Sequence, residues 1–199
     1  MNTTKRVIAV AAISILTAGV AAADHYELDN AHTKILFKVK HLGISTVTGQ
    51  FKGFSGFFDV DPDNLSTLKA SATIDAASID TENGDRDNHL RSPDFFDAEK
   101  YPEIKFVSTK AKKLSGDELE LHGDLTIHGV TQSVVLKGEF GGALNAMGKP
   151  RAAFTASGKI NRKDFGLTWN RALETGGLVV SEEVIIVLEV EGVGTKATE

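Results

Sequence analysis

The residues most able to do chemistry gather in one segment, from Arg86 to Phe106, which reads RDNHLRSPDFFDAEKYPEIKF. Its first part lacks two-residue alternation and can form one or two helical turns, which would place Arg86 and His89 near one face. Guanidinium groups such as those of Arg86 and Arg91 donate paired hydrogen bonds to carboxylates and phosphates. The segment could therefore bind an anionic or polar head group. The alternative is that its arginines fix it to acidic residues on neighbouring loops.

Signals for catalysis and for metal binding are weak. The chain has no Gly-x-Ser-x-Gly motif, and Asp85 and Asp87 are placed as helix-capping or ion-pairing carboxylates usually are. His122 and His128 share a face of one predicted strand but lie about 20 Å apart, at about 3.4 Å per residue. The other histidines show no ligand spacing, and there is no cysteine to complete a zinc site. The sequence therefore predicts no enzyme activity, no metal site and no cofactor.

Outside this segment the chain alternates apolar and polar residues, as half-buried antiparallel strands do. The alternation predicts eight long strands, at about residues 33–41, 46–61, 66–80, 103–112, 117–128, 132–142, 151–161 and 182–193. Short turns join most of them, so we expect an all-β, eight-stranded antiparallel up-and-down barrel. A short helical flap is expected near residues 85–92, ended by Ser92-Pro93 because the residue before proline leaves the helical region. Residues 25–29 are predicted to be a lead-in, and 141–150 to be a glycine-rich loop.

The interior of such a barrel can hold its own side chains or one small ligand. The predicted inward positions mix large and small residues, and mid-strand alanines would leave room for a ligand, although small residues can also fit the taper of a filled barrel. The residues predicted to line a ligand-binding lumen are Phe37, Val39, Phe51, Ala72, Ile74, Phe106, Leu121, Leu136, Phe154, Ala156, Ile186 and Leu188. The residues predicted to contact the ligand from the flap side are Arg86, His89, Arg91, Phe95, Phe96 and Trp169.

The first 23 residues have the pattern of a secretory signal peptide. Lys5 and Arg6 precede an apolar run, and Ala21-Ala22-Ala23 fits the small-residue cleavage site. We expect cleavage after Ala23, a single mature domain of residues 24–199, and a periplasmic location, which suits an exported chain without cysteine. Loss of Lys5 and Arg6 takes the formal charge from −5 to −7, which argues against nucleic acid as a partner.

Four motifs follow one another along the mature chain. They are FKVKHLGISTVTGQF (37–51), IDTENGDRDNHLRSPDFFDAEKYPEIKF (79–106), GDLTIHGVTQ (123–132) and RKDFGLTW (162–169). Together they resemble the YceI-like family of bacterial lipid- or polyisoprenoid-binding proteins, over essentially the whole mature chain. The resemblance implies a lipocalin-like barrel that holds an isoprenoid or a fatty-acid-like lipid in its pore, in a binding or carrier role without catalysis.

These observations predict a periplasmic, non-catalytic binding or carrier protein for a long-chain isoprenoid or another amphipathic lipid. The alternative is a barrel with a filled core that acts as a stress-linked interaction protein of the cell envelope. A membrane quinone-linked partner and a homodimer are left open by the sequence.

Overall fold

The computed structural model describes residues 23–174 and 176–194, so the predicted signal peptide lies outside the described residues except for Ala23. Within this range, no helix is long and apolar enough to cross a membrane. The helical segments are η1 (Ala76–Ser78), α1 (Gly84–Arg91) and η2 (Arg162–Phe165). The strands are β1 (Asp24–Leu28), β2 (Lys34–His41), β3 (Ser45–Phe51), β4 (Phe54–Asp61), β5 (Asn64–Asp75), β6 (Ile79–Asp80), β7 (Glu103–Lys113), β8 (Glu118–Ile127), β9 (Val130–Ala146), β10 (Lys149–Asn161) and β11 (Val180–Gly194).

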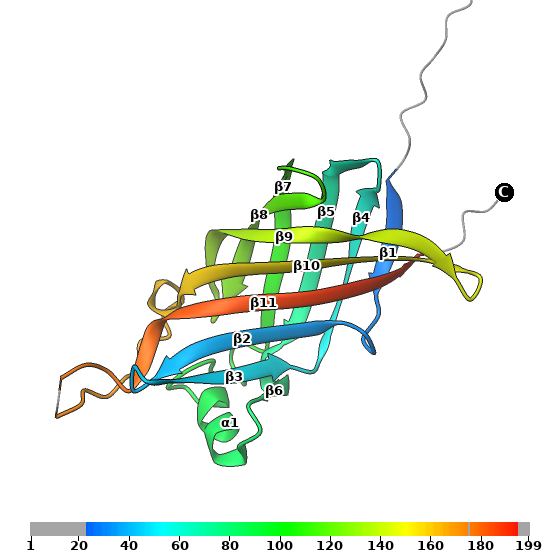
Figure 1. Ribbon diagram of the computed structural model, residues 1–199. Helices are drawn as coiled ribbons and strands as arrows, with labels where there is room; N and C mark the ends of the chain where they lie inside the picture. The colour runs from blue at the N-terminus through cyan, green and yellow to red at the C-terminus, as the bar shows by residue number, and fades with distance from the viewer. Residues whose placement is uncertain (1–22, 175, 195–199) are drawn as a thin grey trace, which may run out of the picture.

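The strand segments form one antiparallel sheet that closes on itself (Figure 1). Neighbours follow the order β1-β4-β5-β7-β8-β9-β10-β11-β2-β3-β6, and β1 also pairs with β11. Both β1 and β2 lie along β11, β1 at residues 192–194 and β2 at residues 180–189, so they are two parts of one interrupted strand. The same holds for β3 with β4 and for β5 with β6. Counted in this way, the sheet is the expected eight-stranded up-and-down barrel.

The prediction of a lead-in at residues 25–29 was wrong, because most of this segment is strand β1. Tyr26 is 1% exposed, and its ring stacks on that of Phe58 in β4 at 5.1 Å between centroids. The backbone leaves the sheet only at Asp29, whose carbonyl oxygen accepts hydrogen bonds from the amides of His32 and Thr33. This turn hides the continuity of β1 and β2 from a search for alternation.

The prediction of a glycine-rich loop at residues 141–150 was also wrong, because β9 runs to Ala146 and β10 begins at Lys149. Gly141 and Gly142 lie inside β9, where the register against β10 shifts between Ala153 and Phe154, as a β-bulge requires. The connection is a two-residue turn at Met147 and Gly148, both with positive φ (52° and 78°), the type I′ geometry that suits tight hairpins. β9 and β10 therefore extend further than the alternation alone predicted.

The helical flap is confirmed as α1, which lies beside β6 below the barrel in the view of Figure 1. The side chain of Asn83 caps its first turn by accepting from the amide of Arg86, and Ser92 ends it. Asp87 is buried and accepts hydrogen bonds from the amide and the hydroxyl of Thr81, at 2.9 and 2.5 Å. This pairing joins α1 to the segment that follows β6.

The core has two parts that fill different ends of the barrel. At one end, side chains from β1, β4, β5, β8, β9 and β10 pack tightly, and Val60, Leu65 and Leu119 are at most 2% exposed. At the other end, a second cluster joins the barrel to the residues around the flap and to Phe165 and Leu167, which follow β10. We call the first the filled end and the second the flap end.

Candidate functional site

An apolar cavity of about 190 Å³ lies inside the barrel, and its wall includes residues of both core clusters. Its lining residues come from every strand except β6 and from the segments around α1 and η2. Three of them are polar, namely Thr33, Ser71 and Arg162. A space of this composition offers burial to hydrocarbon and very few hydrogen bonds.

Two glycines allow large rings to lie against the wall of this cavity. A Cβ atom added to Gly49 would lie 2.3 Å from Cζ of Phe37, and one added to Gly123 would lie 2.4 Å from Cζ of Phe106. The two rings thus occupy the space that a side chain on the adjacent strand would take. Because the rings cover the wall, the centre of the barrel keeps more room.

The predicted lumen residues lie along this cavity with one exception. Ala156 is buried, but it packs into the cluster of the filled end and does not border the cavity. Alternation placed the predicted lumen residues on the inward face of their strands, but it does not tell how far along the barrel the open space extends. Contact of the lining residues with a ligand stays a prediction. The predicted residues that border the cavity are Phe37, Val39, Phe51, Ala72, Ile74, Phe106, Leu121, Leu136, Phe154, Ile186 and Leu188.

The flap residues divide into two groups. Phe95 and Phe96 border the cavity, whereas the two arginines do not. Arg86 donates from Nε to the hydroxyl of Thr81 and from Nη2 to its carbonyl oxygen, each at 2.7 Å. Arg91 donates to the carbonyl oxygens of Ala77 and Ile79, at 2.7 and 2.8 Å. Both arginines thus hold α1 against the chain around η1 and β6, through backbone oxygens and the hydroxyl of Thr81 and not through the acidic residues that the sequence suggested.

His89 and Trp169 also lie beside the cavity and not on its wall. With Phe95 they form a cluster of three rings, whose centroids are 4.9 Å (His89–Trp169), 5.0 Å (His89–Phe95) and 5.1 Å (Phe95–Trp169) apart. His89 belongs to α1 and Trp169 to the segment after η2. We call this cluster the aromatic latch, because it joins the flap to a part of the chain 80 residues away.

The sequence did not single out Arg162, which is 5% exposed and borders the cavity at the flap end. The side chain of Asn161 caps the short helix η2, and Gly166 ends it with a positive φ of 83°. This tight turn folds Phe165 and Leu167 inward and brings Arg162 with them. The available signal was the apolar Phe165 and Leu167 close behind Arg162 within RKDFGLTW, which indicates a segment that turns back onto the core.

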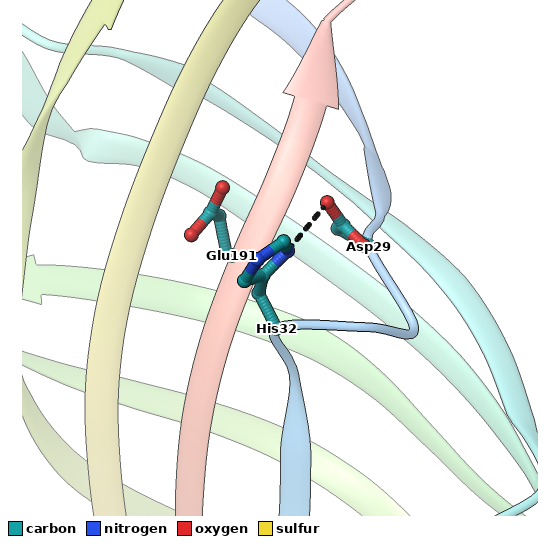
Figure 2. A group of neighbouring side chains, drawn as sticks. All are labelled: Asp29, His32 and Glu191. Atoms are coloured by element: carbon teal, nitrogen blue, oxygen red, sulfur yellow. Dashed lines mark hydrogen bonds and ion pairs between the residues drawn. The ribbon is translucent and has the colours of Figure 1, made fainter.

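A second polar group, on the outside of the barrel, is formed by Asp29, His32 and Glu191 (Figure 2). One potential ligand atom from each lies within 4.8 Å of the others, so the three have the spacing of a metal site. The guanidinium of Arg151 already donates to both carboxylates, to Asp29 at 3.0 Å. The hydrogen bond from His32, with those from the amide of Ala31 and from Arg151, lowers the pKa of Asp29 to about 2. Since Arg151 already forms ion pairs with both carboxylates, we interpret the group as an ion-pair network and not as a metal site.

The closed sheet and its apolar interior define the class of protein, a lipocalin-like β-barrel with an internal cavity. The profile of the YceI-like domain matches residues 26–192, and the chain belongs to the YceI-like family. Protein YceI of Escherichia coli O157:H7 is 41% identical over 185 residues, which cover 92% of this chain and 93% of the relative.

Solved structures show the same fold. A YceI protein of Campylobacter jejuni is 38% identical and has a TM-score of 0.70, over 79% of this chain and 90% of that one. A polyisoprenoid binding domain from Saccharophagus degradans, implicated in plant cell wall breakdown, has a TM-score of 0.63 over 87% of this chain and 99% of that one. At 17% identity, the second likeness concerns the fold alone.

Proposed function

We propose that this protein is a periplasmic, non-catalytic binding or carrier protein that holds the long apolar chain of an isoprenoid or another amphipathic lipid inside its barrel. The observation that carries the proposal is the cavity, whose wall is apolar apart from Thr33, Ser71 and Arg162. Each methylene group buried there contributes about 0.8 kcal/mol, part of which is offset by the ordering of the chain. The polyisoprenoid binding named for the domain of the same fold supports this ligand class by analogy.

The volume of the cavity implies that the lumen adapts to its ligand. An engineered cavity of about 150 Å³ holds one benzene molecule, so a space of about 190 Å³ takes only a short piece of a long chain. Phe51 contacts Phe37 and Phe96, with centroids 5.8 and 5.7 Å apart, and all three rings border the cavity. We propose that these rings change rotamer together when a longer chain enters. The alternative function, an interaction protein of the cell envelope, was predicted with a filled core, so the cavity favours the lipid-binding proposal.

The absence of catalysis and the periplasmic location belong to the same proposal. Arg162 is the one charged side chain on the described part of the cavity wall, and arginine stays protonated near neutral pH, so it is a poor acid or base. The location rests on the sequence pattern of residues 1–23. A membrane quinone-linked partner and a homodimer remain proposals. Pull-down with membrane extracts would test the partner, and light scattering would test the homodimer.

The first experiment is native mass spectrometry with solvent extraction on protein purified from the periplasm of its own cells. We expect a discrete excess mass that extracts as a lipid. In the variant Ala72→Trp an indole would fill the lumen, so bound lipid should be lost or shortened. Thr73→Trp is the matched control, because Thr73 is adjacent on β5 and does not border the cavity. Equal lipid in both variants, or no lipid uptake by the wild type, would contradict the proposal.

A further inference from the structure

Arg162 is a buried cation at the edge of an apolar space. It follows β10 directly as the first residue of η2, and it is 95% buried. Among the residues that the structure describes, it is the one charged side chain that borders the cavity. A guanidinium in such surroundings has lost most of its hydration, so its remaining donors need acceptors.

The protein provides hydrogen-bond acceptors for two of the three guanidinium nitrogens of Arg162. Nε donates to the carbonyl oxygen of Ser181 at 2.9 Å, and Nη1 donates to that of Leu167. Nη2 is buried and has no hydrogen-bond partner among the described residues. Both acceptors are neutral carbonyls, so they orient the guanidinium without neutralising its charge.

The acidic side chains on the adjacent strand β11 are directed to other cations. Glu182 pairs with Lys163 at 3.2 Å, and Glu183 pairs with Lys159 at 3.0 Å. No carboxylate among the described residues lies within ion-pair distance of Arg162, whose pKa burial lowers from its ordinary value. The group still stays protonated at neutral pH, because arginine does not deprotonate in proteins. The charge of Glu182 opposes this lowering of the pKa from a distance, but no carboxylate of the described residues contacts the guanidinium. The flap end of the cavity therefore carries a positive charge that no ion pair within the described part of the chain neutralises.

We propose that Nη2 of Arg162 binds the oxyanion of the ligand's head group, a carboxylate or a phosphate ester, at the flap end of the lumen. This rests on the proposed lipid-binding function and names the chemistry of the ligand's polar end. The apolar chain then extends toward the filled end, where Phe58 and Phe154 border the cavity. Arg86 and Arg91 do not take this role, because they do not border the cavity and their donors serve acceptors of Ala77, Ile79 and Thr81, around η1 and β6.

Competition binding with ligands of one chain length and different heads tests the assignment. Hexadecanoate, hexadecyl phosphate and hexadecanol would displace the uncharged dye phenylnaphthylamine from the extracted wild-type protein. We expect the better anion to bind about tenfold to a hundredfold more tightly than the alcohol, as a charged hydrogen bond does. The preference between hexadecanoate and hexadecyl phosphate distinguishes a carboxylate from a phosphate ligand.

Three variants identify the residue responsible for the preference for an anionic head group. In Arg162→Met the ratio of anion to alcohol affinity should fall to about one, while hexadecanol still binds. Arg171→Met removes the same charge from an exposed position near the same end and should keep the ratio. In Arg86→Met the ratio should also persist. A ratio that survives in Arg162→Met, or falls in Arg86→Met alone, would overturn the inference while leaving lumen binding intact. Failure of all three ligands to bind the wild type would overturn the proposed function and this inference together.

A measurement on the wild type keeps the test open if Arg162→Met does not fold. Carboxyl-labelled hexadecanoate bound to the protein would be titrated by carbon NMR. A carboxylate beside Arg162 should have a pKa below that of an ordinary carboxyl group, because the cation favours its charged form. A carboxyl group lying in the apolar lumen without that partner would have a raised pKa, and this result would contradict the inference.

Discussion

The carboxylate of Asp29 shows how one side chain can join parts of the barrel that are distant in the sequence. It accepts hydrogen bonds from the amide of Ala31 at 2.9 Å and from Arg151 of β10 at 3.0 Å, and Nδ1 of His32 lies 3.0 Å away (Figure 2). Arg151 also pairs with Glu191 of β11. Since β1 and β2 separate at this turn, the network stabilises the place where the interrupted strand meets β11.

Removal of this carboxylate should destabilise the protein in a pH-dependent way. The pKa of Asp29 is about 2 in the folded state against 3.8 ordinarily, so its contribution is present above the ordinary value and is lost as pH falls through about 2. Asp29→Asn should therefore lower the free energy of unfolding near neutral pH, and the difference from wild type should vanish near pH 2. Urea denaturation at a series of pH values measures this difference in unfolding free energy. Asp63→Asn, in the exposed turn after β4, is the control for a change of net charge. A deficit that stays constant with pH would contradict the assignment.

Single residues also mark the limit of prediction from sequence. Alternation is sufficient to place Phe37 or Leu121 on the inward face, because a strand presents every second residue to the core. It cannot tell a buried arginine from an exposed one. Arg86 stood out in the sequence near a histidine, yet its donors bind Thr81, where they fix α1 to the segment after β6. Arg162 is buried because η2 folds back over the barrel, and that depends on the packing of Phe165 and Leu167.

Among the elements, the flap is held by few contacts in comparison with the strands. Each barrel strand has hydrogen-bonded neighbours, whereas α1 is held by the hydrogen bonds of Arg86, Asp87 and Arg91, by the packing of Leu90 and by the aromatic latch. Elements with few packed contacts open at lower free energy than the sheet does. We therefore expect the flap end to be the route by which a lipid enters and leaves, since the other end is filled by side chains such as Leu65 and Leu119.

Loss of the latch should speed ligand release and leave the barrel stable. Trp169 contacts His89 and Phe95, and each aromatic pair is worth about 0.5–1.5 kcal/mol. Trp169→Ala should therefore raise the release rate of a bound fluorescent fatty acid by about tenfold, as followed by stopped-flow fluorescence, with a small change in melting temperature. Trp169→Phe keeps a ring in the latch and should release lipid at nearly the wild-type rate. An unchanged rate in Trp169→Ala would show that the lipid leaves by another route.

The elements were predictable where local patterns decide them, and less so where tertiary contacts do. The flap followed from Ser92-Pro93 and the loss of alternation, and the eight strands followed from period-two patterning. The division of the first strand at Asp29 and the bulge in β9 at Gly141 did not, because both are adjustments of register between neighbouring strands. A sequence window reports one strand at a time and does not contain its partner.

For the molecule as a whole, the two ends of the barrel differ in a way that gives the lumen a direction. Arg162 borders the cavity at the flap end, and Phe58 and Phe154 meet edge to face, with centroids 5.2 Å apart, where the cavity reaches the filled end. A bound lipid would then place its head near Arg162 and its tail against these rings. The depth of the lumen, and so the preferred chain length, should depend on the rings.

Deepening the filled end should therefore lengthen the preferred ligand. Phe154→Ala removes a ring that borders the cavity, whereas Phe140→Ala removes its cross-strand neighbour, equally buried at 7% against 6% but away from the cavity. Both variants should lose about 3–5 kcal/mol of unfolding free energy, the usual cost of deleting a buried phenylalanine. Only Phe154→Ala should move the optimum of a series of fatty acids to longer chains, because each further methylene buried adds about 0.8 kcal/mol, or roughly fourfold in affinity. Dye displacement across the series measures the optimal chain length.

Two outcomes would contradict this prediction. If both variants moved the optimal chain length equally, general loosening of the core would explain the effect. If neither did, the tail of the lipid would not end at Phe154, and the proposed direction of the ligand would be wrong.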